Sequence, residues 1–299
     1  MPLTSSKSFQ DIGARLRAHR LGKGMTPDQL AKTLKISRAA LYRAEKGEIR
    51  KIEMLTSIAD VLGVSLTSLM GVEVEYLSTS ISFFERMRQI EEESQQLIGM
   101  FSPVSYLLTS DQYDSMLYEA LLESISRNRG DKVELRNDID LLMEILKKRK
   151  TSFHLRRPLI ASIISLMDIE RFLIFGVVGR HDLDPKTVEK RRQVAYAETE
   201  RILGMFRSPE IGVQIGLVRE PIPTTSFQIF RQESRSLVAV SPFRLGDQPN
   251  TRIGVGLITG APEALTLHEK IAEELWSEAE KGEQAAKSLE EIMSAFGVG

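Results

Sequence analysis

The chain has 299 residues, of which 42% are hydrophobic and 27% are charged, with a formal net charge of -1 and no cysteine. This length predicts about two domains, and the absence of cysteine excludes disulfide frameworks, thiol nucleophiles and cysteine-ligated metal ions. No apolar run approaches the roughly 20 residues that a membrane-spanning helix needs, and the N-terminal residues lack the apolar segment of a signal peptide, so we expect a cytoplasmic protein.

Charge is divided unevenly along the chain. Residues 1–71 hold 12 Lys and Arg against 6 Asp and Glu, whereas residues 72–299 hold 28 against 35. The basic charge is therefore concentrated in the first quarter, where it favours contact with phosphate groups. The acidic remainder is not expected to bind DNA by itself.

Two short helical patterns separated by a tight turn are the clearest feature of the basic part. Thr26 is predicted to cap the first helix, with Pro27 at its first position and Gln29 completing a capping box. Ser37 is predicted to cap the second helix, and Gly47 to end it. A second helix that begins with polar side chains is typical of the pair that places a recognition helix in the DNA major groove.

A family resemblance rests on this segment. The text LAKTLKISRAALYRAEKG, followed by IEMLTSIADVLGVSLTSLM, resembles the phage-repressor-like helix-turn-helix of the XRE type over about residues 9 to 70. The resemblance implies an all-α, five-helix DNA-binding domain over residues 1–71. A three-helix core without a DNA-binding role would explain the apolar periodicity, but not the polar and basic residues at the start of the second helix.

The recognition helix and its surroundings supply the predicted DNA contacts. Base contacts are expected from four side chains that project away from the apolar face of the second helix: Arg38, Ala39, Tyr42 and Arg43. Phosphate contacts are expected from Arg20, Thr26, Lys46, Arg50 and Lys51. The family usually has glutamine where this chain has Pro27, and proline offers no donor, so one phosphate contact of the family is expected to be missing.

The resemblance also implies an ion pair between Arg20 and Glu45 that fixes the recognition helix on the helix before it. The alternative is two solvated surface charges, which would stabilise the domain little.

Residues 72–102 are predicted to be a helical linker. Its apolar positions follow steps of four and three, a spacing typical of a coiled-coil seam, at Phe83, Met87, Ile90, Ser94, Leu97 and Phe101. The seam has two possible interpretations: a dimerisation helix, or an amphipathic helix docked on the second domain.

Residues 103–299 are predicted to form an α+β regulatory domain for sensing or dimerisation. Helices are expected to start at Asp111, at Asp131 and at Asp184, and two more to close the chain after Pro262. Four strands of one sheet are expected near residues 211–217, 227–229, 237–240 and 253–257. The basic run at residues 147–150 is interpreted as the end of a helix or, alternatively, as a nucleic-acid patch.

Motifs of catalysis are incomplete or missing. His268-Glu269 begins a zinc-protease motif, but Ala272 stands where the second histidine ligand belongs. We therefore expect no enzyme, no metal and no cofactor. The loop of residues 241–252 offers Arg244, Asp247 and Arg252 as a possible ligand or subunit contact, which a solvated loop would explain equally well.

These observations predict a multi-domain, sequence-specific DNA-binding transcriptional regulator. It is expected to act as a homodimer on double-stranded DNA with a pseudo-palindromic operator, with an unknown small-molecule effector as a possible further partner. The alternatives are a ligand-binding or enzymatic domain that the helix-turn-helix targets to DNA, and an antitoxin-like autoregulator.

Overall fold

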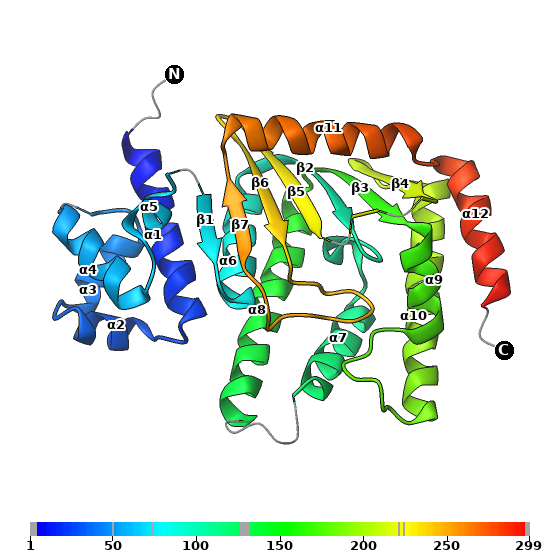
Figure 1. Cartoon of the computed structure of the whole chain (residues 1–299), viewed down its shortest axis with the longest axis horizontal. Coiled ribbons are helices and arrows are strands. Elements are labelled where there is room, and N and C mark those ends of the chain that lie inside the picture. The colour runs from blue at the N-terminus through cyan, green and yellow to red at the C-terminus, as the bar shows by residue number, and fades with distance from the viewer. Residues whose placement is uncertain are drawn as a thin grey trace.

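The computed structural model describes residues 5–49, 51–72, 74–125, 132–220, 222–223 and 225–296, and the side chains from Phe9 onward. The first part is a bundle of five helices that lies beside the sheet domain (Figure 1). Its helices are α1 (Ser5–Gly22), α2 (Pro27–Thr33), α3 (Arg38–Glu45), α4 (Ile52–Leu62) and α5 (Leu66–Met70). The predicted five-helix domain is thereby confirmed.

Local capping explains where these helices begin. The Thr26 hydroxyl accepts from the Gln29 backbone N–H at 3.2 Å, and the Gln29 side chain accepts from the Thr26 backbone N–H at 2.7 Å, which completes the predicted capping box. The Ser37 hydroxyl accepts from the Ala40 backbone N–H at 3.1 Å. Each bond satisfies a backbone donor that the first helical turn leaves without a partner. Leu16, Leu30, Leu41 and Ile58 are fully buried between the helices.

A seven-stranded mixed sheet forms the centre of the second part (Figure 1). Its strand order is β1-β7-β6-β5-β2-β3-β4, in which β2, β3 and β4 are parallel and the remaining pairs are antiparallel. The strands are β1 (Val74–Leu77), β2 (Ser94–Phe101), β3 (Leu159–Ser165), β4 (Val213–Val218), β5 (Ser226–Gln232), β6 (Ser236–Ser241) and β7 (Gly256–Thr259). The predicted α+β class is confirmed, but the sheet is larger than the four strands expected. Three of those strands correspond to β4, β5 and β6. The fourth, expected at residues 253–257, begins only at Gly256 as β7, and Ile253 and Val255 are exposed before it.

Helices cover both faces of this sheet. They are α6 (Ser80–Glu92), α7 (Asp111–Glu123), α8 (Lys132–Arg156), α9 (Leu166–Phe175), α10 (Pro185–Arg207), α11 (Pro262–Glu278) and α12 (Gly282–Ala295), with a short 3-10 helix at Tyr106–Leu108. α11 lies along one face, and the helices between β1 and β4 cover the other (Figure 1). Each face has its own core: Ile163 packs on the α11 side, and Ile160 and Ile164 pack on the opposite side.

The expected helical linker over residues 72–102 requires correction. The helix α6 ends at Glu92, and Leu97 and Phe101 lie on β2 in the middle of the sheet. Phe83, Met87 and Ile90 are buried in the core of the same chain. Because these side chains are already covered, they do not form a dimerisation seam. Up to Ile90 the structure agrees with the other interpretation, an amphipathic helix docked on the second domain.

The basic run at residues 147–150 also differs from both interpretations. It lies inside α8, which continues to Arg156. Arg149 pairs with Glu91 at 2.6 Å and Lys150 pairs with Asp114 at 2.6 Å, and both basic side chains are buried. Arg149 and Lys150 therefore form buried ion pairs within the fold. The run neither ends a helix nor forms a nucleic-acid patch. The expected cap at Asp131 lies outside the described residues.

Among the described residues, no helix is both long enough and apolar enough to cross a lipid bilayer.

Candidate DNA interface

The recognition helix α3 presents one continuous exposed face. Arg38, Ala39, Tyr42 and Arg43 are all exposed, whereas Leu41 and Ala44 on the other side of the helix are fully buried. Residues three or four apart are neighbours on a helix, so Tyr42 lies next to both Arg38 and Ala39, and Arg43 lies next to Ala39. The four exposed side chains therefore share one face. That face carries two guanidinium groups, which are the side chains that bond most often to guanine edges.

Three of the expected phosphate-binding residues stand around this face. Thr26, Lys46 and Lys51 are exposed, and the Lys46 ammonium lies 4.6 Å from the centre of the Tyr42 ring. Lys51 precedes α4 and makes no capping bond with its side chain, so its charge is available. Arg50 lies outside the described residues.

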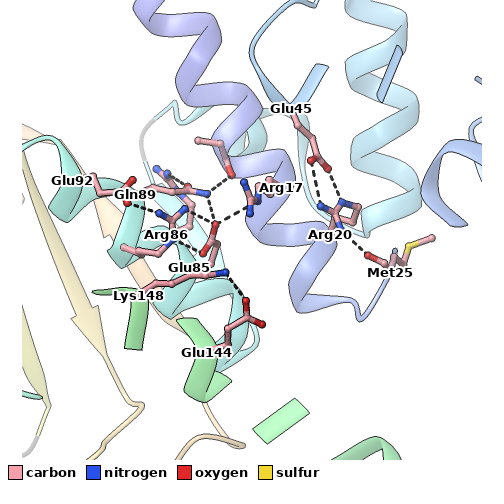
Figure 2. A network of polar contacts seen from close by, with 12 residues as sticks. Arg17, Arg20, Met25, Glu45, Glu85, Arg86, Gln89, Glu92, Glu144 and Lys148 are labelled. Carbon is pink, nitrogen blue, oxygen red and sulfur yellow. Dashed lines mark hydrogen bonds and ion pairs between the residues drawn. The ribbon is translucent and has the colours of Figure 1, made fainter. Parts of the chain in front are cut away.

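Arg20, another expected phosphate contact, is buried, whereas Lys46 and Lys51 are exposed. Its guanidinium donates to both carboxylate oxygens of Glu45, at 2.6 and 3.2 Å, and to the Met25 carbonyl oxygen at 2.8 Å (Figure 2). Arg20 is only 5% exposed. The two residues therefore form a largely buried, bidentate pair instead of two solvated charges, and little of Arg20 is left to reach a phosphate.

A glycine that the sequence reasoning missed brings α1 against the end of α3. A Cβ atom on Gly13 would lie 2.6 Å from the Glu45 carbonyl oxygen and 2.6 Å from the Gly47 backbone nitrogen. Only glycine permits this approach of two backbones. Its signal in the sequence was a glycine inside an amphipathic helical pattern, where it normally costs stability.

The same helix α1 is attached to the sheet domain by a buried charge cluster. Glu75 on β1 accepts from Arg15 of α1 at 3.1 Å and from Arg86 of α6 at 2.8 Å, and all three side chains are buried. Burial would raise the pKa of Glu75, but the charges of Arg86 and Arg15 outweigh burial and hold that pKa below its usual range. His19 also borders Glu75, at 4.0 Å, and burial lowers its pKa.

Further contacts join α1 to the sheet domain. Gln89 of α6 donates to the Ala14 carbonyl oxygen at 3.1 Å, and Glu85 lies 3.6 Å from Arg17 (Figure 2). Arg235, in the turn between β5 and β6, donates to both carboxylate oxygens of Asp11 at 2.6 and 3.0 Å. The helix that supports the recognition helix is thus held by the second domain at several points.

The three candidate contacts in the loop of residues 241–252 do not come together. Arg244 is exposed and lines a cavity beside the sheet. Asp247 is buried and accepts from the Arg171 guanidinium at 2.8 Å. Arg252 lies apart from both and donates to the Ser124 carbonyl oxygen at 3.4 Å.

Comparison with known proteins assigns only the first part of the chain. Residues 11–69 match a family model described as a helix-turn-helix domain. No curated protein and no solved structure matches the chain. The match covers α2 and α3 together with the helices that support them, so residues 11–69 are a helix-turn-helix domain, the kind of domain found in DNA-binding regulators.

Proposed function

We propose that this chain is a sequence-specific transcriptional regulator of the XRE type that binds DNA as a homodimer and is not an enzyme. Its residues 72–299 would serve for sensing an effector, for dimerisation, or for both. The observation that carries the proposal is the exposed face of α3, with Arg38 and Arg43 on it, braced from behind by the Arg20–Glu45 pair.

The distribution of charge along the chain also supports a DNA-binding function. The excess of basic residues in the first 71 positions coincides with the helix-turn-helix domain, so phosphate attraction and base reading act from one surface. In this proposal Arg38, Ala39, Tyr42 and Arg43 contact bases, and Thr26, Lys46, Arg50 and Lys51 contact phosphates. Arg20 acts by orienting α3.

We propose a homodimer because the surface of one chain that contacts bases is small. One recognition helix contacts few bases, and two such helices on one face of DNA lie about 34–36 Å apart, one helical turn. The seam expected at residues 83–101 is buried within the chain, so the proposed homodimer would need another surface.

Selection of duplex DNA from a random library by the purified full-length protein tests the function. We expect enrichment of a pseudo-palindrome with half-sites about 10 base pairs apart, and sedimentation of two protein chains on one duplex. Enrichment of no sequence would contradict a specific regulator. A single unrepeated half-site bound by one chain would contradict the homodimer.

A further inference from the structure

A cavity of about 240 Å³ lies at the carboxyl ends of the parallel strands β2 and β3. Phe101 ends β2 and Ser165 ends β3, and both line it. At this point the direction of the sheet changes, because β5 runs antiparallel beside β2. Open sheets of α/β proteins commonly bind ligands outside the carboxyl ends of their strands, where strand order or direction changes.

Aromatic rings form a wall of this cavity. Phe83 and Phe84 of α6 and Phe243 after β6 all line it. Their ring centres lie 5.4 Å apart for Phe83 and Phe84, and 5.7 Å apart for Phe83 and Phe243. A wall of this kind favours a flat apolar body, since aromatic rings attract each other edge to face or in offset stacks.

Polar groups without partners line the same cavity. The Ser105 hydroxyl and the Gln228 side-chain oxygen are buried and hydrogen-bond to none of the described residues. Ser105 is 0% exposed. The Tyr106 hydroxyl also lines the cavity, but burial and the Asp114 carboxylate that it faces together raise its pKa. A buried polar atom without a partner costs about 1–3 kcal/mol, so two in one cavity indicate a polar occupant.

The opening of the cavity carries positive charge. Arg244 is exposed and forms no ion pair with any residue that the structure describes. Arg171 beside it is held by Asp168 at 3.0 Å and by Asp247 at 2.8 Å. Among the described residues, Asp168 is the carboxylate that lines the cavity, and it is already paired with Arg171, so the opening favours an anion.

We propose that this cavity binds a small hydroxylated aromatic carboxylate. The ring would lie against Phe83, Phe84 and Phe243, the hydroxyl would bond with Ser105 and Gln228, and the carboxylate would meet Arg244 at the opening. One water takes up about 30 Å³ of liquid, so the cavity holds a ligand on the order of ten non-hydrogen atoms.

The helix α6 connects this site to the DNA-binding part. Phe83 and Phe84 line the cavity, while Glu85, Arg86 and Gln89 of the same helix contact α1 or the cluster that holds it. A ligand that moves or stiffens α6 therefore acts on the helix that braces α3. This coupling rests on the proposed function, whereas the ligand site does not.

Binding is tested on the full-length protein without DNA. The probes are 4-hydroxybenzoate, 4-hydroxyphenylacetate and 4-hydroxycinnamate, measured by titration calorimetry beside benzoate and the uncharged 4-hydroxybenzamide. We expect at least one hydroxylated acid to bind with a Kd below 1 mM and about tenfold more tightly than the compounds that lack the hydroxyl or the charge. Failure of all three acids to bind at 1 mM would overturn the site.

Two variants assign the contacts. Arg244→Gln should lose the preference for 4-hydroxybenzoate over its amide, and Ser105→Ala should lose the preference over benzoate. Arg252→Gln is the matched control, because it removes an exposed arginine of the same loop that does not line this cavity. Equal binding by all three variants and the unchanged protein would overturn the assignment. DNA affinity measured with and without the bound acid then tests the coupling through α6, and an acid that binds without changing DNA affinity would overturn only that coupling.

Discussion

Arg15 of the helix-turn-helix domain donates to Glu75 of β1 across 3.1 Å, and their side chains are only 7% and 3% exposed. The carboxylate also neutralises Arg86, so two buried cations from different helices depend on one anion. The two parts of the chain are thereby joined by a charge cluster that neither part can satisfy alone. Removing one member of such a buried cluster strongly destabilises the folded protein, because it leaves a buried charge without a partner.

Glu75→Gln should destabilise the folded chain by about 3–5 kcal/mol, because it leaves two buried guanidinium groups without a counter-charge. Urea unfolding at neutral pH measures the change. Glu144→Gln is the control, since it removes an exposed carboxylate from a surface pair with Lys148 (Figure 2) and should cost less than about 0.5 kcal/mol. Equal losses for the two variants would contradict the cluster's importance.

His19 makes stability depend on pH. Its pKa in the folded chain lies below the ordinary 6.5, mainly because it is buried, although Glu75 opposes and Arg86 and Arg15 reinforce that effect. Below pH 6.5 the unfolded chain therefore binds a proton that the folded chain does not, so the free energy of unfolding falls as pH falls.

The free energy of unfolding should fall by up to about 1.4 kcal/mol for each pH unit below about pH 6.5. His19→Gln should flatten the dependence of unfolding free energy on pH between pH 7.5 and 5.5. Parallel curves for the two proteins would show that His19 is not the group responsible.

Gly13→Ala should destabilise the chain even though alanine is the better helix former by about 1 kcal/mol. The added Cβ would lie 2.6 Å from the Glu45 carbonyl oxygen, so α1 and the end of α3 must separate. Gly204→Ala, in the last turn of α10, meets no atom within 4 Å and should stabilise the chain. A shift of Tm in the same direction for both variants would argue against the close contact of α1 and α3.

Arg38→Ala should weaken binding to the selected DNA site by about 1–3 kcal/mol and relax the preference at one base pair. The reason is that Arg38 is exposed at the start of α3, where a guanidinium bonds to a guanine edge. Binding to a panel of single-base variants of the site measures both effects. An unchanged preference at every base pair would remove Arg38 from the base contacts.

Lys51→Ala should weaken binding to every DNA sequence about equally and reduce the slope of log affinity against log salt by about one unit. Its side chain is exposed and caps no helix, so the folded structure should not change. Lys287→Ala, an exposed lysine on α12, serves as the control and should leave the slope unchanged. A loss confined to one base pair would instead make Lys51 a base contact.

The sequence predicted elements whose causes are local. Thr26 and Ser37 cap their helices within three residues, and β4 and β5 contain an alternation of apolar residues that is visible without a partner. The Arg20–Glu45 pair came from the family resemblance, not from spacing. The structure adds the geometry that makes it a buried, bidentate contact.

The elements that the sequence did not predict depend on residues far away in the chain. β3 has the sequence LIASIIS, which is mostly apolar without a strict alternation, because a parallel strand with neighbours on both sides is buried on both faces of the sheet. The steps of four and three that predicted one helix from Phe83 to Phe101 cross the boundary at Glu93, and only the sheet decides that the second half is a strand. Glu75 and Arg15 are 60 residues apart, so nothing local marks them as a pair.

The place of β1 in the sheet has a consequence for synthesis of the chain. β1 carries Glu75, yet it pairs with β7, whose residues are 256–259. The helix-turn-helix domain is complete by residue 69, so it leaves the ribosome before the strand that anchors it has a neighbour. At 5–20 residues per second this interval lasts about 10–40 s. During that time the nascent chain carries a finished helix-turn-helix domain whose neighbouring strand β1 is not yet part of the sheet.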